Sequence, residues 1–426
     1  MKQPALNNNI HLLADHLFRH ESGKMVAVLT RLFGMHNLEL AEDVMQEAFA
    51  KALKEWTFGL PPNPSGWLML TAKNKAIDVI RRERYSKEFA RETSMLLRSE
   101  YTTAPVVEKL FMEYEIQDSQ LRMIFACCHP ALAPADQIAL TLKTCSGFGV
   151  QEIAAALLSN SETIKKRLQR AKNTIIEKKI NFDIPLGSDL KNRLDIVLHT
   201  LYLLFNEGYK SCDKEEIIRK DLCEEALRLA LLLTKNNITN LPKTNSLVAL
   251  MTLLAARLDS RLNEDGEIVL LADQDRSKWN AELMRIGLHY LNMAAEGEEL
   301  STYHLEAAIV AEHSMAKSFQ ETNWQNIVNL YDHLAQMNPS PTVHLNRAVA
   351  LSKLKGNEAA INAIKAIDDI EKLENSQYLF PAVLGELYAN IGDKAKAGYY
   401  FKIAISLTSS AQEKKLLGKK MIFPEQ

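Results

Sequence analysis

The residues best suited to chemistry in this chain are cations that follow one side of a short helical pattern, residues 161–179. This stretch holds seven Lys or Arg and only two Glu. Ile164, Leu168 and Ala171 recur at the spacing of one apolar helix face. A row of cations on the opposite face would neutralise phosphates, so the pattern indicates nucleic-acid binding. That face carries Lys165, Lys166, Arg167, Gln169, Arg170 and Lys172.

Two short helices joined by a tight break must position this basic face. Ile153, Ala154 and Leu157 give the first helix an apolar side, and the break falls at residues 159–160. Ser161 and Glu162 suit the opening turn of the second helix, through a side-chain cap and a favourable charge. This pattern is typical of a helix-turn-helix, whose second helix enters the major groove. A basic, solvated helix at the end of an ordinary bundle is the alternative interpretation.

A second basic region lies upstream, after the rigid turn at residues 61–64. Between residues 71 and 91 there are seven Lys or Arg against three acids. Bases beside an aromatic side chain suit melted DNA, where bases stack and phosphates need neutralising. A solvated helix with one core Trp is the alternative. We expect an inward-facing set of Trp67, Leu70, Ala76, Ile77 and Ile80.

Composition favours an all-α protein, because Gly and Pro are sparse, at 16 and 13 of 426 residues, and helical periodicity dominates. No apolar run reaches the roughly 18 residues that span a bilayer, so no membrane association is expected. The first residues lack a secretory signal pattern, which predicts a cytoplasmic location. Five Cys without paired spacing indicate reduced thiols.

Charge is distributed unevenly along the chain. Residues 1–182 contain 24 Lys or Arg and 20 Asp or Glu, whereas residues 183–426 contain 27 and 33. A basic N-terminal part followed by an acidic C-terminal part is typical of a nucleic-acid-binding domain followed by a protein-interaction domain. The polar, poorly periodic stretch 87–114 is predicted to be a linker between the two basic regions.

The C-terminal part contains an internal repeat. Gly356 and Gly392 are 36 residues apart, and Ala359 and Ala395 have the same separation. A period of this length, with helix, Gly turn and helix, is typical of stacked helical hairpins. Only two units are clear, so the helices at about 301–337 are expected to cap or extend the stack.

The order of these motifs resembles the sigma-70 family, in its extracytoplasmic-function type. The similarity rests on AEDVMQEAF, then WL…AKNKAIDVIRRER, and then IALTLKTCSGFGVQEIAAALLSNSETIKKRLQRAK. The long extension resembles the subgroup with a C-terminal tetratricopeptide-like domain. The implied domains are sigma domain 2 over 1–86, a linker over 87–114, sigma domain 4 over 115–182, a helical extension over 183–298, and tetratricopeptide-like repeats over 299–426.

The resemblance also implies partners and site residues. The partners are core RNA polymerase, through its β′ clamp helices and β subunit, and promoter DNA. Arg would bond a guanine edge, Gln an adenine edge, and Lys more often a phosphate. Polymerase binding is expected from Asp43, Gln46, Glu47 and Phe49; −10 binding from Trp67, Lys73, Asn74, Asp78, Arg81 and Arg82; and −35 binding from Ser161, Lys165, Lys166, Arg167, Gln169 and Arg170.

The predicted function is therefore promoter-specific transcription initiation, with the extension regulating it through an intramolecular contact. The alternatives are a stand-alone helix-turn-helix regulator and a helical-repeat scaffold or ligand-binding protein. No catalytic motif appears, so neither an enzyme nor a cofactor is expected. Cys127-Cys128-His129 lacks a second Cys pair and is not expected to bind metal. Residues 206–209 and 273–276 are predicted to be buried struts or helix caps, with a ligand pocket as the alternative.

Overall fold

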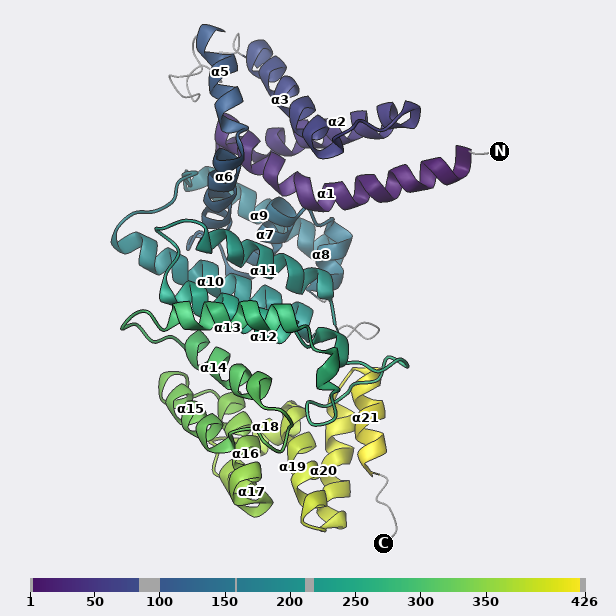
Figure 1. The fold of residues 1–426 in the computed structure, drawn as a ribbon, viewed down its shortest axis with the longest axis vertical. Helices are drawn as coiled ribbons and strands as arrows, with labels where there is room; N and C mark the ends of the chain where they lie inside the picture. The colour runs from purple at the N-terminus through teal and green to yellow at the C-terminus, as the bar shows by residue number, and fades with distance from the viewer. Residues whose placement is uncertain (1–2, 84–99, 158, 211–217, 422–426) are drawn as a thin grey trace. The chain divides into compact units, whose positions relative to one another are not determined.

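The computed structural model describes residues 3–83, 100–157, 159–210 and 218–421 (Figure 1). Within these ranges the chain is helical, and its only strand-like contact is an isolated bridge between Leu262 and Ile268. The predicted all-α class is confirmed. In the same ranges, no helix combines the length and apolar character needed to cross a membrane. The chain divides into two compact units, 1–203 and 204–426, with the boundary inside α10 (Ser188–Tyr209).

Unit 1 begins with a group of three long helices. Gly34 ends the first of them with φ +88°, a conformation that glycine adopts without strain. Trp56 and Leu68 are fully buried between the helices and form the centre of this group. The elements are α1 (Gln3–Phe33), η1 (Met35–Asn37), α2 (Leu38–Glu55), η2 (Trp56–Phe58) and α3 (Pro64–Glu83).

The second group of unit 1 contains the predicted helix-turn-helix. Its helices are α5 (Glu100–Leu110), α6 (Glu113–Cys127), α7 (Pro134–Ser146), α8 (Val150–Ala156) and α9 (Ser161–Glu177). Pro134 opens α7, and Gly147 ends it in the left-handed conformation, φ +68°. The stretch 87–114, expected to be a linker, thus includes α5, while residues 87–99 lie outside the described ranges.

The helix α1 packs on both groups of unit 1. A Cβ atom on Gly23 would overlap the backbone oxygen of Cys145, so α1 and α7 approach each other as closely as glycine permits. Arg31 Nη1 lies 2.8 Å from Glu115 Oε2 and 3.0 Å from Asp118 Oδ2, which ties the end of α1 to α6. The two groups therefore share α1 as a common support.

Two further details of these helices differ from the sequence prediction. Leu70 is half exposed rather than packed inward, because the buried stripe of α3 runs through Leu68, Ala72 and Ala76, and position 70 points away from it. The cap of α9 is Asn160, whose side chain accepts a hydrogen bond from Thr163 N at 2.7 Å, so Ser161 is the first helical residue instead.

Unit 2 is a succession of helices joined by turns and loops. Caps fix several of their starts: Ser340 accepts from Val343 N, and Asp393 accepts from Lys396 N at 3.0 Å. The helices are α11 (Lys220–Thr234), α12 (Pro242–Ala255), α13 (Ala281–Ala294), α14 (Thr302–Met315), α15 (Trp324–Met337), α16 (Pro341–Lys355), α17 (Asn357–Lys365), α18 (Ile370–Ser376), α19 (Leu379–Asn390), α20 (Lys394–Leu407) and α21 (Ala411–Met421), with short turns η4 (Leu258–Ser260) and η5 (Arg276–Lys278).

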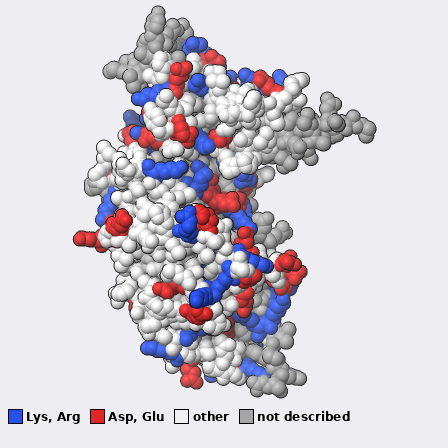
Figure 2. Space-filling view, in the orientation of Figure 1, with Lys and Arg blue, Asp and Glu red and all other residues white. Residues whose placement is uncertain are grey.

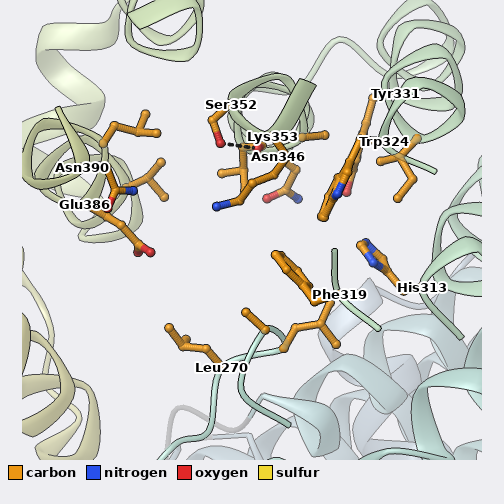
Figure 3. A pocket seen from close by; sticks show the side chains of 17 residues that line it. Leu270, His313, Phe319, Trp324, Tyr331, Asn346, Ser352, Lys353, Glu386 and Asn390 are labelled. Atoms are coloured by element: carbon orange, nitrogen blue, oxygen red, sulfur yellow. Dashed lines mark hydrogen bonds between the residues drawn. The ribbon is translucent and has the colours of Figure 1, made fainter. Parts of the chain in front are cut away.

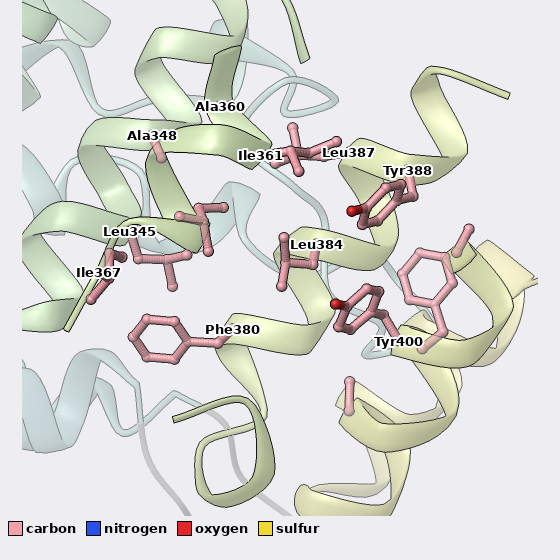
Figure 4. Packing of buried hydrophobic residues seen from close by; sticks show 14 of the residues in the cluster. Leu345, Ala348, Ala360, Ile361, Ile367, Phe380, Leu384, Leu387, Tyr388 and Tyr400 are labelled. Carbon is pink, nitrogen blue, oxygen red and sulfur yellow. The ribbon is translucent and has the colours of Figure 1, made fainter. Parts of the chain in front are cut away.

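The repeat found in the sequence corresponds to two helical hairpins, α16–α17 and α19–α20. Gly356 and Gly392 form their turns with φ +90° and +85°. Figure 4 shows the apolar cluster between them, in which Phe380 and Leu384 are fully buried. Tyr388 and Tyr400 stack with centroids 5.5 Å apart. The helix–Gly–helix pattern is confirmed, and its assignment to the tetratricopeptide class stays a prediction.

Candidate functional site

An acidic and amide-bearing face lies on the solvent side of α2. Asp43, Gln46 and Glu47 are all exposed, at the i, i+3 and i+4 spacing that brings side chains together on a helix. Phe49, expected in the same set, is instead buried and packs edge-to-face on Phe18 with ring centroids 4.9 Å apart. Three of the four residues thus share one accessible face, and Phe49 supports that face from below.

A polar hollow of about 360 Å³ lies between α2 and α3. Asn74 and Asp78 of α3 line it, together with Glu47 of α2. Lys75 forms an ion pair with Glu47 across it. Asn74 and Asp78, which are expected to bind DNA, therefore lie next to Glu47, which is expected to bind polymerase. Three other residues also line the hollow: Lys51 and Thr71, which were not predicted site residues, and Lys75, which was predicted only as part of the basic face.

The remaining −10 candidates lie along α3. Trp67 is half buried and packs edge-to-face on Trp56, with centroids 5.6 Å apart. Lys51 Nζ lies 5.8 Å from the centroid of the Trp67 ring, a cation–π distance. Lys73 is half buried, whereas Arg81 and Arg82 are exposed at the C-terminal end of the helix. An aromatic ring and several cations therefore lie on the same helix as Asn74.

The helix α9 shows the predicted division into two faces. Ile164, Leu168, Ala171 and Ile175 are buried. The opposite side carries Lys165, Lys166, Gln169 and Arg170 as exposed residues, with Ser161 and Arg167 half buried. Its charges suit phosphate contacts, and its amide and guanidinium groups suit base edges.

Arg170 is already held by a carboxylate of its own domain. Its Nε and Nη2 donate to the two oxygens of Asp136 at 2.6 and 2.5 Å. Asp136 is buried, and its hydrogen bonds raise the pKa of Arg170. This fork-to-fork pair fixes the guanidinium on the side of α9 that faces α7.

A second ion pair joins α9 to α2. Lys172 Nζ lies 3.0 Å from Glu42 Oε2 and 3.3 Å from Glu39 Oε1. Burial lowers the pKa of Lys172, but the two carboxylates outweigh burial and raise it overall, so the ammonium stays charged. The expected −35 helix is thus tied to the expected polymerase-binding helix. Lys172 was predicted to lie on the basic face of this helix, and the structure instead pairs it with α2. The sequence could not indicate this pair, since no local pattern links residues 130 positions apart.

The other polar groups singled out in the sequence have structural roles. Cys127 and Cys128 are buried between α6 and α7, where Cys127 Sγ lies 3.0 Å from Thr144 Oγ1. Burial raises the pKa of Cys128 to about 12. The described residues contain no group of three or more side chains able to bind a metal. On the face in Figure 2, cations and carboxylates are interspersed rather than separated.

Some of the residues predicted to be struts or caps in unit 2 do make such contacts, although Asp273 and Asp275 are exposed rather than buried. Arg261 lies over the Tyr209 ring, 3.9 Å from its centroid, and donates to the Tyr209 carbonyl oxygen. Asp275 caps η5 by accepting from Ser277 N at 3.0 Å. Arg276 Nη1 donates to the backbone oxygens of His313 and Ala316, at 2.6 Å each. These groups fasten irregular segments to neighbouring helices.

Three family descriptions match the chain: Sigma-70 region 2 at residues 17–85, Sigma-70, region 4 at 122–175, and a family of unknown function, DUF6596, at 193–295. An uncharacterized protein of Rhizobium meliloti is 36% identical over 389 residues, 91% of this chain and 90% of that protein. The ECF RNA polymerase sigma factor SigE of Mycolicibacterium smegmatis is 26% identical over 161 residues, 38% of this chain and 59% of SigE. No solved structure gives a significant match.

The two matched sigma regions cover α2, α3 and nearly all of α9, in the same order as the faces described above, and the third match lies inside the predicted extension. We conclude that the chain belongs to the sigma-70 family, as a sigma factor of the extracytoplasmic-function type with a C-terminal extension.

Proposed function

We propose that this sigma factor binds core RNA polymerase and directs it to promoters whose −10 and −35 elements it reads with α3 and α9. The observation that carries the proposal is one unit that exposes an acidic face on α2, a polar hollow beside it, and a separate basic face on α9. Asp43, Gln46 and Glu47 would bind the β′ clamp helices, and further contacts would involve the β subunit.

The hollow between α2 and α3 supports the −10 role. Its volume of about 360 Å³ lies within the range of small-molecule sites, about 300–1,000 Å³, and we propose that it takes one base. Asn74 and Asp78 offer the hydrogen-bonding groups that a flipped base requires. Trp67 would stack on a neighbouring base, while Lys73, Arg81 and Arg82 would neutralise phosphates.

The exposed side of α9 supports the −35 role. Lys165 and Lys166 would bind phosphates, and Gln169 and Arg167 would reach base edges, with Ser161 at the start of the helix. Arg170 has N–H groups that are not bonded to Asp136, and these would donate to DNA. Alternatively, the guanidinium would leave Asp136 and bind DNA instead.

Reading both elements at once requires α9 to leave α2. The two elements are about 25 base pairs apart, or ~85 Å at about 3.4 Å per base pair. In unit 1, however, Lys172 Nζ of α9 lies 3.0 Å from Glu42 Oε2 of α2, so the side chains of the two helices are in direct contact. We therefore infer that the arrangement in unit 1 is a closed state, which opens when the protein engages polymerase and promoter.

We also propose that the extension regulates the sigma domains through an intramolecular contact. Its acidic balance is complementary to the basic front half of the chain. Unit 2 also has its own buried cores, so it can act as a folded partner rather than a tail.

Reversing the charge at Asp43 tests polymerase binding. We expect Asp43→Arg to weaken core polymerase affinity about tenfold or more, since like charges at an interface cost several kcal/mol. Asp43 is the cleaner choice because Glu47 also pairs with Lys75. Pull-down and fluorescence titration with core enzyme would measure this. Glu298→Arg makes the same charge change at an exposed site in unit 2, and equal affinities for both variants would contradict the assignment.

Replacing Lys166 tests phosphate contact by α9. Lys166→Ala should lower affinity for all DNA sequences alike and reduce the slope of log affinity against log salt by about 0.9. Lys235→Ala removes an exposed cation of unit 2 and serves as the control. An unchanged slope for Lys166→Ala, measured by anisotropy across a salt series, would show that this side chain lies away from the phosphates.

Breaking the tie between α9 and α2 tests the closed state. Lys172→Met leaves the Glu42 carboxylate buried and without this partner in the closed form, whereas in the open form solvent reaches it. The substitution should therefore destabilise the closed form by about 1 kcal/mol or more, roughly fivefold. We expect promoter-specific transcription at limiting sigma factor to rise accordingly. A fall in transcription would instead indicate that Lys172 contacts DNA. Lys165→Met, on the exposed face of the same helix, should lower transcription.

Removing the extension tests its regulatory role. The chain should end at Leu203 rather than near residue 185, because Arg193 Nη2 donates to Phe125 O at 2.5 Å and the first half of α10 belongs to unit 1. We expect the shortened protein to differ from the full chain in promoter-specific transcription with core enzyme. Identical transcript levels over a range of concentrations would rule out the regulatory proposal.

A further inference from the structure

Unit 2 contains a cavity of about 290 Å³ that the sigma assignment does not explain. The segment 270–272 forms its floor, and α15, α16 and α19 form its walls. Its volume is near the lower end of small-molecule sites, which are about 300–1,000 Å³. All of its lining residues belong to unit 2, so the cavity is complete within one compact part of the chain.

One wall of the cavity is aromatic. Trp324 packs edge-to-face on Phe319 and on His313, with centroids 5.0 and 5.3 Å away. Figure 3 shows these rings grouped on one side of the open space, with Tyr331 beside them. Burial lowers the pKa of His313 to about 4, so this ring is neutral at pH 7. The wall therefore suits an apolar or aromatic body.

This wall is fixed in place by the strut at η5. Arg276 donates to the backbone oxygens of His313 and Ala316, which lie directly before the segment that carries Phe319. The rings are thus positioned by hydrogen bonds from outside the cavity, without a ligand. A site preformed in this way loses little entropy when it binds.

The opposite wall is polar and carries one uncompensated charge. Asn346 and Lys353 project from α16, and Glu386 and Asn390 from α19 (Figure 3). Glu386 is neutralised by Lys420 Nζ at 2.6 Å. Lys353 has no carboxylate partner among the described residues, and its Nζ lies 5.8 Å from the centroid of the Phe319 ring. Its ammonium therefore attracts an anion to the edge of the aromatic wall.

We propose that this cavity binds a small carboxylate with an aromatic or branched apolar body. The carboxylate pairs with Lys353, and the carboxamide of Asn346 on the same helix is the neighbouring hydrogen-bond donor. The apolar part of the ligand packs against Phe319 and Trp324, in the space above Leu270. A free acid and the C-terminal residue of a peptide share this chemistry, and the limited volume favours the free acid.

Calorimetry on the full chain, without polymerase, tests the proposal. The probes are 3-phenylpropionate, its neutral amide, and the dipeptide Ala-Phe with a free or amidated C-terminus. We expect saturable binding of 3-phenylpropionate and at least tenfold weaker binding of the amide, because the charge-assisted bond is lost. Tighter binding of free Ala-Phe than of the acid would identify a peptide terminus as the ligand and contradict the preference for a free acid.

Lys353→Met should weaken binding of the acid at least tenfold, while Lys355→Met, an exposed neighbour on the same helix that does not line the cavity, should leave it unchanged. Both side chains are exposed, so both variants should fold, which circular dichroism would verify. The proposal fails if no carboxylate binds at millimolar concentration, if acid and amide bind equally, or if Lys353→Met binds as the parent does. None of these outcomes depends on polymerase or promoter binding.

Discussion

The burial of the middle of α1 is the constraint on which the rest of unit 1 depends. Five consecutive residues, Met25–Leu29, are buried, so this part of the helix is covered on every side. One side is covered by α2 and α3, and another by α6 and α7. The absence of a side chain at Gly23 lets α7 come into backbone contact. Large apolar burial of this kind dominates folding energetics and fixes where all functional faces lie.

Once α1 fixes these helices, electrostatics decides the finer arrangement. Lys172 meets Glu42 only because α9 and α2 both lie against the α1 assembly. Such a partly buried pair contributes little net stability, since desolvation offsets much of the attraction. Removal of one partner by mutation is costly, however, because the carboxylate would stay partly buried without its cation. An ion pair that is specific but contributes little stability is suited to a closed state from which α9 must separate.

Unit 2 uses polar struts to organise segments that lack regular structure. Arg261 fastens the bridge region to Tyr209, and Arg276 fastens the end of α14. The apolar cluster of α16–α20 supplies a rigid frame on the other side. The cavity lies where these two kinds of support meet, so its aromatic wall depends on hydrogen bonds made by residues that sequence reasoning had assigned only a structural role.

The sequence by itself determined the helical class, the two faces of α9, the acidic side of α2 and the glycine turns of the hairpins. These features follow from periodicity within one element, where neighbours three or four residues apart share a face. Only the tertiary structure decided that Phe49 is buried, that Leu70 is exposed, that Lys172 pairs with Glu42, and that Phe319 and Lys353 line one cavity. The reason is physical: each of these facts depends on which distant helices pack together, and no spacing within one helix records which helix will cover it.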